Sequence, residues 1–131
     1  IKPSELTDQH LIAEYREIFM VGGSLKRTLV SKTGYQESKV PKQYTLNAGH
    51  VYFFYNKGQY LDKRYQELIK EMKKRGFKPD KTRTFPKEIF VKNGLYNDWI
   101  PNPEDYKLIR QRIEEKIKMK PEWYRKTGNN Q

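Results

Sequence analysis

The feature that most limits the fold of this chain is the spacing of its apolar residues, which recur at the helical period of about 3.6 residues in three segments. The clearest stripe lies between Gln59 and Arg75, where four residues follow at i, i+4, i+7 and i+11: Leu61, Tyr65, Leu68 and Met72. Gly76 stands where a helix commonly ends in a left-handed residue. This pattern predicts one amphipathic helix.

The segment from about Ser4 to Ser31 is also predicted to be helical. Its apolar residues fall near one face: Leu11, Tyr15, Ile18, Leu25 and Leu29. Ser4 is a candidate N-cap, and Glu5 suits the positive end of the helix dipole. Because Gly22 and Gly23 interrupt the pattern, we expect a kink there or a split into two helices.

A third helix is predicted to start at Asn102, since Asn is a good N-cap and Pro103 follows at the first helical position. Pro121 ends it. Its stripe is predicted to be buried and consists of Tyr106, Ile109, Ile113 and Ile117.

Irregular, turn-rich chain is expected between the helices, in segments 32–47, 78–91 and 92–101. The aromatic run from Val51 to Tyr55 has strand propensity, but a lone strand has no partner. We interpret it as buried connecting chain or as a short helical lead-in to the second helix. The sequence thus predicts a single all-α domain, residues 1–131, of three main helices with long irregular loops.

The charge of the chain limits its partners. Lys and Arg number 27 against 16 Asp and Glu, a net charge of +11, while only 35% of residues are hydrophobic. The core should be small, and a polyanion is the expected partner, with nucleic acid ahead of an anionic membrane surface. There is no Cys and no apolar run near the ~20 residues of a membrane span. We therefore expect a soluble intracellular protein.

Six residues on the first helix, all but one of them polar, lie opposite its apolar stripe or beside it: Gln9, His10, Ala13, Glu14, Arg16 and Glu17. His10 and Glu17 are seven residues apart and share a face, and Ala13 between them leaves space for a ligand. The alternative is an ordinary solvated face.

A row of cations, Arg112, Lys116 and Lys120, lies on one face of the third helix and suits a phosphate backbone, or again a solvated face. Trp123 and Tyr124 follow directly. They suit base stacking, although such a pair also packs on cores. His50 has no second ligand at metal-binding spacing, and no phosphate-binding glycine loop is present, so neither a metal nor a cofactor is expected.

Five blocks of the chain resemble the phage-type pyrimidine-dimer DNA glycosylases, also called pyrimidine-dimer-specific endonuclease V. The first two blocks, residues 4–17 and 48–57, are long and specific. Shorter matches follow in the family's order, at residues 74–77, 98–101 and 121–124. The resemblance covers essentially the whole chain.

This resemblance implies an all-α DNA repair enzyme. Such glycosylases excise ultraviolet-induced pyrimidine dimers from duplex DNA through an imine and nick the backbone by β-elimination, an AP lyase activity that needs no metal. The family's nucleophile is the α-amine of an N-terminal Thr, and Glu17 matches its catalytic carboxylate. By the same resemblance, these residues bind DNA: Gln9, His10, Arg16, Lys26 or Arg27, Arg112, Lys116, Trp123 and Tyr124.

The family's extreme N-terminus, including the Thr, has no counterpart in this sequence. Because Ile1 is not a natural first residue, we expect that residues are missing or that the chain was processed. The leading hypothesis is a monomeric glycosylase acting on damaged double-stranded DNA in the cytoplasm of a bacterial or phage-infected cell. The alternative is a non-catalytic binder of damaged or distorted duplex DNA. Glu17 favours the enzyme, because a pure binder needs no carboxylate facing phosphates.

Overall fold

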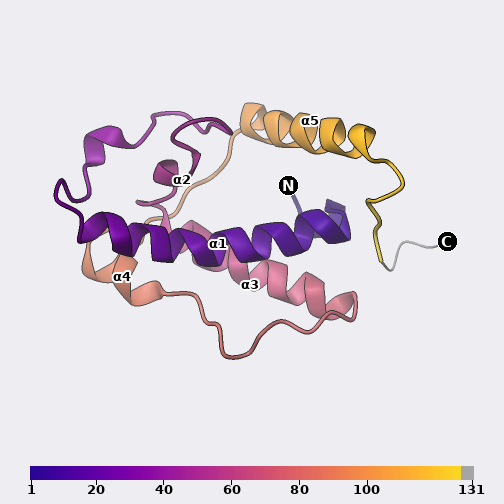
Figure 1. Cartoon of the computed structure of the whole chain (residues 1–131), viewed down its shortest axis with the longest axis horizontal. Helices are drawn as coiled ribbons and strands as arrows, with labels where there is room; N and C mark the ends of the chain where they lie inside the picture. The colour runs from indigo at the N-terminus through magenta and orange to yellow at the C-terminus, as the bar shows by residue number, and fades with distance from the viewer. Residues whose placement is uncertain (128–131) are drawn as a thin grey trace.

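The computed structural model describes residues 1–127 and shows three long helices joined by short helices and irregular chain (Figure 1). The long helices are α1 (Asp8–Leu29), α3 (Gly58–Lys74) and α5 (Pro103–Met119). The short helices are η1 (Pro3–Glu5), η2 (Glu37–Lys39), α2 (His50–Phe53) and α4 (Lys87–Lys92). Residues 1–127 contain no strand. The prediction of an all-α fold with three main helices is confirmed.

Helix α1 begins later than predicted and is not interrupted. Its N-cap is Thr7, whose hydroxyl accepts a hydrogen bond from the backbone N–H of His10, while Ser4 belongs to η1. The predicted split at Gly22 is wrong, because the helix runs through to Leu29. Gly22 is required by packing instead: a Cβ there would lie 2.3 Å from Cγ of Pro86.

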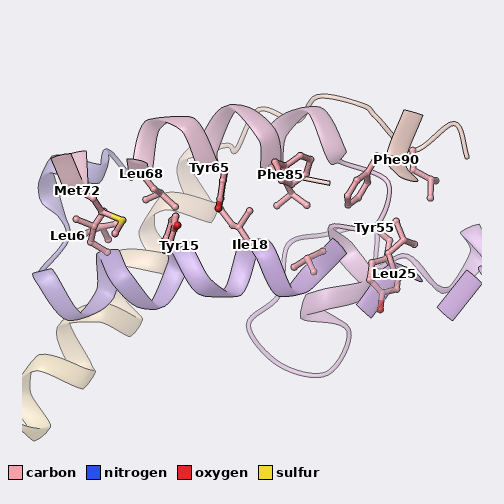
Figure 2. Close-up of a cluster of buried hydrophobic side chains, with 14 residues drawn as sticks. Leu6, Tyr15, Ile18, Leu25, Tyr55, Tyr65, Leu68, Met72, Phe85 and Phe90 are labelled. Carbon is pink, nitrogen blue, oxygen red and sulfur yellow. The ribbon is translucent and has the colours of Figure 1, made fainter. Parts of the chain in front are cut away.

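The core forms where α1 packs on α3. Figure 2 shows Tyr15 and Ile18 of α1 pointing toward Tyr65 and Leu68 of α3. The rings of Tyr15 and Tyr65 stack with their centroids 5.2 Å apart. All four residues of the predicted stripe of α3 are buried, and Gly76 follows the helix with φ of +89°. The prediction for this helix is confirmed.

Three short helices lie in segments that the sequence left irregular or undecided, and the first is η2 within 32–47, where wholly irregular chain was predicted. The aromatic run after Gly49 forms α2, which confirms the reading as a short helical lead-in. The prediction of wholly irregular chain over 78–91 is wrong, because α4 occupies its end and buries Phe90 in the core. A helix of six residues is too short to show an apolar stripe.

Helix α5 begins as predicted, with a capping box between Asn102 and Asp105. The prediction that its stripe is buried is wrong, since no residue of α5 is buried and Ile109, Ile113 and Ile117 are only half-buried. In Figure 1, α5 runs above α1, while α3 and α4 lie below it. Ile109 and Ile113 line a pocket that lies between α5 and α1.

The N-terminal segment of the chain is tied to the end of α3 through Arg75, whose side chain is 2% exposed. Its guanidinium forms ion pairs with Asp8 at 2.9 Å and with Glu71 at 2.8 Å, and it also donates to the carbonyl of Leu6. A buried guanidinium needs such a full set of acceptors. Arg75 thus fixes the start of α1 against the end of α3.

Candidate active site

A pocket of about 400 Å³ lies between α1 and α5. Its walls come from seven parts of the chain: the N-terminal segment, α1, the segment around α2, the start of α3, Trp99, α5 and the segment that follows α5. The lining of the pocket includes Glu17, a carboxylate, together with the cations Arg112 and Lys116. This combination distinguishes the pocket from an ordinary apolar gap between helices.

The α1 wall of the pocket is the polar face that the sequence singled out. His10, Ala13, Glu14 and Glu17 follow one another at i, i+3, i+4 and i+7, so the helix presents them together. Their neighbours Leu11 and Tyr15 point the other way, into the core, while the buried Ile18 borders both the core and the pocket. The structure therefore places this face along the wall of a pocket, where Ala13 and Glu17 remain accessible to solvent.

Glu17 is held in a setting that disfavours its charge. Burial raises the pKa of its carboxyl above the usual value, and the charge of Glu14 acts in the same direction. His50 and Lys116 oppose this rise without cancelling it. A carboxylate with a raised pKa binds a proton more readily, which suits a group that shuttles protons.

Glu14 is paired with a residue that sequence reasoning missed. Arg64 on α3 donates to both carboxylate oxygens of Glu14, at 2.6 and 3.0 Å, and also to the carbonyl oxygen of Ile1. All three residues line the pocket. Arg64 lies on the helical face next to the apolar stripe, so its charge alone did not distinguish it from the solvated cations of α3.

The predicted cationic row is divided by the structure. Arg112 and Lys116 line the pocket, opposite the α1 wall. Lys120 is the C-cap of α5 and lies outside the lining, with its ammonium 5.8 Å from the ring centroid of Trp123. Two of the three cations therefore border the pocket.

Trp123 and Tyr124 also line the pocket and do not belong to the core. Tyr124 stacks on His10 with the ring centroids 4.7 Å apart and the planes 4° apart. Trp123 is 54% exposed. Burial and the nearby charge of Lys116 lower the pKa of His10, which favours the neutral form of the ring. The pair and His10 together form an aromatic rim.

The remaining residues predicted for the site lie elsewhere. Arg16, Lys26 and Arg27 are exposed on α1 and do not line the pocket. Gln9 does line it, but its side-chain amide is hydrogen-bonded to the backbone of the segment after α5. The structure therefore separates an inner group of site residues from cations on the outer surface.

An aromatic wall of the pocket was not predicted. It is formed by Tyr44, His50, Phe54, Tyr60 and Trp99. The rings are in mutual contact; for example, the centroids of Tyr60 and Trp99 are 4.9 Å apart. The run of aromatics from Val51 to Tyr55 was the available signal, but it does not say which rings face a pocket and which the core.

Within residues 1–127, no group of three or more His, Asp or Glu side chains is arranged to hold a metal ion. In the same range, no helix has the length and apolar character needed to cross a bilayer.

A comparison with known families agrees with the resemblance. A family model described as pyrimidine dimer DNA glycosylase matches residues 1–85. The match includes α1 with Glu17, α3 with Arg64 and most of the aromatic wall, whereas Trp99, α5 and the aromatic pair lie outside it. Because it spans more than half of the 131 residues, the chain belongs to the pyrimidine dimer DNA glycosylase family.

Proposed function

We propose that this protein is a pyrimidine-dimer DNA glycosylase with AP lyase activity and that residues 1–131 form its single catalytic domain. The observation that carries the proposal is the position of Glu17, a carboxylate of raised pKa in a pocket whose opposite wall holds Arg112 and Lys116. The cations suit the phosphates on either side of a lesion, and the carboxylate suits the sugar between them.

The proposed reaction starts with an amine. Its lone pair attacks C1′ of the damaged nucleotide, the glycosidic C1′–N1 bond breaks, and the base leaves with the bonding electrons and takes up a proton. The attacking nitrogen loses its protons, one of which passes to O4′ as the C1′–O4′ bond breaks and the sugar ring opens, and an imine forms at C1′. The imine acidifies the C2′ proton, and its removal expels the 3′-phosphate by β-elimination. Glu17 stabilises the positive charge that develops on the sugar and moves the protons.

The N-terminal end of the described chain supports delivery of the amine. Ile1 lines the pocket and is held there by Arg64. An α-amine has a pKa of about 8, so a usable neutral, nucleophilic fraction exists at neutral pH. The proposed nucleophile is the α-amine of an N-terminal Thr that precedes Ile1, as the family resemblance implies.

The outer cations complete the proposed DNA surface. With a net charge of +11, the chain has ample positive charge to hold a strained duplex. Arg16 and Lys26 or Arg27 extend the surface along α1, beyond the pocket. Contacts to phosphates at these positions position the duplex, while Trp123 and Tyr124 at the pocket recognise the distorted bases.

Borohydride trapping tests the proposal, because it reduces an imine to a stable amine and leaves a covalent protein–DNA adduct. A chain with Thr restored before Ile1 at the family's spacing should give an adduct on dimer-containing and on abasic duplex DNA. The chain that begins at Ile1 should react weakly, or on abasic DNA alone, where the base is already gone. Salt-dependent binding of damaged duplex without any adduct in the restored chain would favour the non-catalytic binder instead.

A further inference from the structure

The segment that follows α5, residues 123–127, is fixed to the start of α1 by a single glutamine side chain. The amide of Gln9 donates from Nε2 to the carbonyl oxygen of Trp123 at 2.7 Å. Its Oε1 accepts from the backbone N–H of Arg125 at 3.1 Å. One side-chain amide therefore satisfies two backbone groups of this segment, which leaves it little freedom to contact anything else.

Asp8 binds the same segment further toward the C-terminus, at Arg125 and Thr127. Its backbone N–H donates to the carbonyl of Arg125 at 2.7 Å, and its carboxylate accepts from both the backbone N–H and the hydroxyl of Thr127. The bonded backbone groups belong to residues 123, 125 and 127, which is the alternation of one edge of an extended chain. Asp8 and Gln9 thus form hydrogen bonds to one edge of this segment, as a neighbouring β-strand would.

The anchor behind these bonds is rigid. Asp8 is buried and pairs with Arg75, and Arg75 is itself fixed by Glu71 and by the carbonyl of Leu6. The cross-link therefore reaches from the end of α3 through the start of α1 to Thr127. A short segment without secondary structure of its own would otherwise lose order, because fixing each residue costs about 1–2 kcal/mol of conformational entropy.

The docked segment determines where the aromatic pair lies. Tyr124 falls between the two bonded residues Trp123 and Arg125, and it stacks on His10, which is the residue next to Gln9. Trp123 packs edge-on against Tyr124 with the centroids 4.9 Å apart and also lines the pocket. Both rings owe their place to a backbone that Gln9 and Asp8 hold.

We propose that Gln9 and Asp8 are positioning residues, which hold residues 123–127 across the start of α1 and so place Trp123 and Tyr124 at the pocket for lesion discrimination. Gln9 acts through this segment and not through a contact with DNA. The role in discrimination rests on the proposed function, whereas the docking itself does not.

The test uses Gln9→Met, which keeps the length and charge of the side chain and removes its donor and acceptor. Amide hydrogen exchange is measured without DNA, and affinity is measured for dimer-containing and for plain duplex. Because two hydrogen bonds are lost, exchange at the Arg125 amide should become faster by about fivefold or more. The ratio of the two affinities should fall, and the salt dependence of binding should stay the same. Gln66→Met, an exposed glutamine of α3, is the matched control and should change neither readout.

A second variant, Thr127→Val, removes the hydroxyl bonded to Asp8 at the far end of the segment and should reproduce both effects more weakly. The inference is overturned if Gln9→Met weakens binding to both duplexes equally and leaves the exchange of Arg125 unchanged, since that is the result of a direct DNA contact. The inference is also overturned if exchange of the Arg125 amide becomes faster while the ratio of affinities for dimer-containing and plain duplex stays the same. Failure of the parent protein to cleave dimers would refute the proposed function alone, because the exchange measurement uses no DNA.

Discussion

The two faces of α1 differ in what lies across from them. Leu11, Tyr15 and Ile18 meet α3 directly and are buried, so their contribution is to stability. His10 and Glu17, on the other face, meet a pocket that separates them from α5. The first face is closed and apolar, whereas the second keeps a carboxylate whose pKa is raised by burial. One helix thus carries both the core and the candidate chemistry.

This difference teaches that helical spacing assigns residues to a face but does not say what covers that face. His10 and Glu17 share one face of α1, whereas Arg16 and Lys26 lie on its other sides and are exposed outside the pocket. The first face forms a pocket wall because α5, a helix more than 70 residues further along the chain, lies across from it. We therefore expect mutations on the pocket face to change activity and mutations on the core face to change stability.

The largest effect is expected from Glu17→Gln on the pocket face. We expect the rate of dimer excision in the restored chain to fall by about 100- to 10,000-fold, the usual contribution of a positioned proton-transfer group. The free energy of unfolding at neutral pH should stay equal or increase. The sign follows from the raised folded-state pKa of Glu17: the ionised carboxylate destabilises the fold above that pKa, and the amide carries no charge.

Single-turnover excision assays and urea unfolding measure these two quantities. Glu88→Gln on α4 is the matched control, since it makes the same chemical change at an exposed position outside the pocket. Full dimer cleavage by the Glu17→Gln protein would show that the catalytic role assigned to Glu17 is wrong. DNA binding should persist or improve, because one negative charge near the phosphates is removed.

A mutation in the core between α1 and α3 should lower stability and leave activity nearly unchanged, the opposite of what is expected for Glu17→Gln. Leu68→Ala empties a fully buried position between α3 and α1, so we expect the free energy of unfolding to fall by about 2–5 kcal/mol. Activity per folded molecule should change little, because Leu68 does not line the pocket. Urea unfolding followed by circular dichroism gives the first quantity. A loss of activity at conditions where the variant is fully folded would contradict the separation of the two faces.

The sequence predicted what depends on neighbours along the chain and missed what depends on distant contacts. The stripe of α3 and the Asn102 cap of α5 are local patterns, and both are confirmed. The half-burial of Ile109 and Ile113 is set by the pocket across from α5, so an apolar stripe alone wrongly predicted a buried one. Arg64 is part of the site because Glu14, fifty residues earlier, accepts from it.

Gly22 shows the same limit in a single residue. The sequence suggested a break in α1, but the residue is small because Pro86 packs against it. We expect Gly22→Ala to lower the free energy of unfolding by about 1–3 kcal/mol through overpacking. Gly23→Ala is the matched control: its Cβ would meet only the Arg27 guanidinium at 3.7 Å, so it should be neutral or stabilising by up to about 1 kcal/mol. Thermal unfolding of both variants measures the contrast, and equal effects would contradict it.

Asp8 should make the stability of the anchored end depend on pH. Burial alone raises the pKa of its carboxyl, but hydrogen bonds from Thr127 and Arg75 outweigh burial and lower it below the usual value. The stabilisation is therefore present above the unfolded pKa of about 4 and is lost as the pH falls through the lower folded pKa. Asp8→Asn should flatten the fall in stability below about pH 4. Urea unfolding as a function of pH tests this, and an unchanged profile would contradict it.

The smallest effect is expected at the cations across the pocket. Lys116→Gln removes one charge from the wall opposite Glu17, whereas Lys73→Gln removes one from an exposed position on α3, outside the pocket. If Lys116 contacts a phosphate, its loss should reduce the slope of log affinity against log salt by about 0.9, with damaged and plain duplex weakened alike. Lys73→Gln should leave the slope nearly unchanged, because counterion release requires contact with the phosphates. Binding titrations at several salt concentrations give both slopes. Equal slopes in the two variants would mean that the positive charge acts through the whole surface of the molecule. They would contradict a phosphate contact specific to the pocket face.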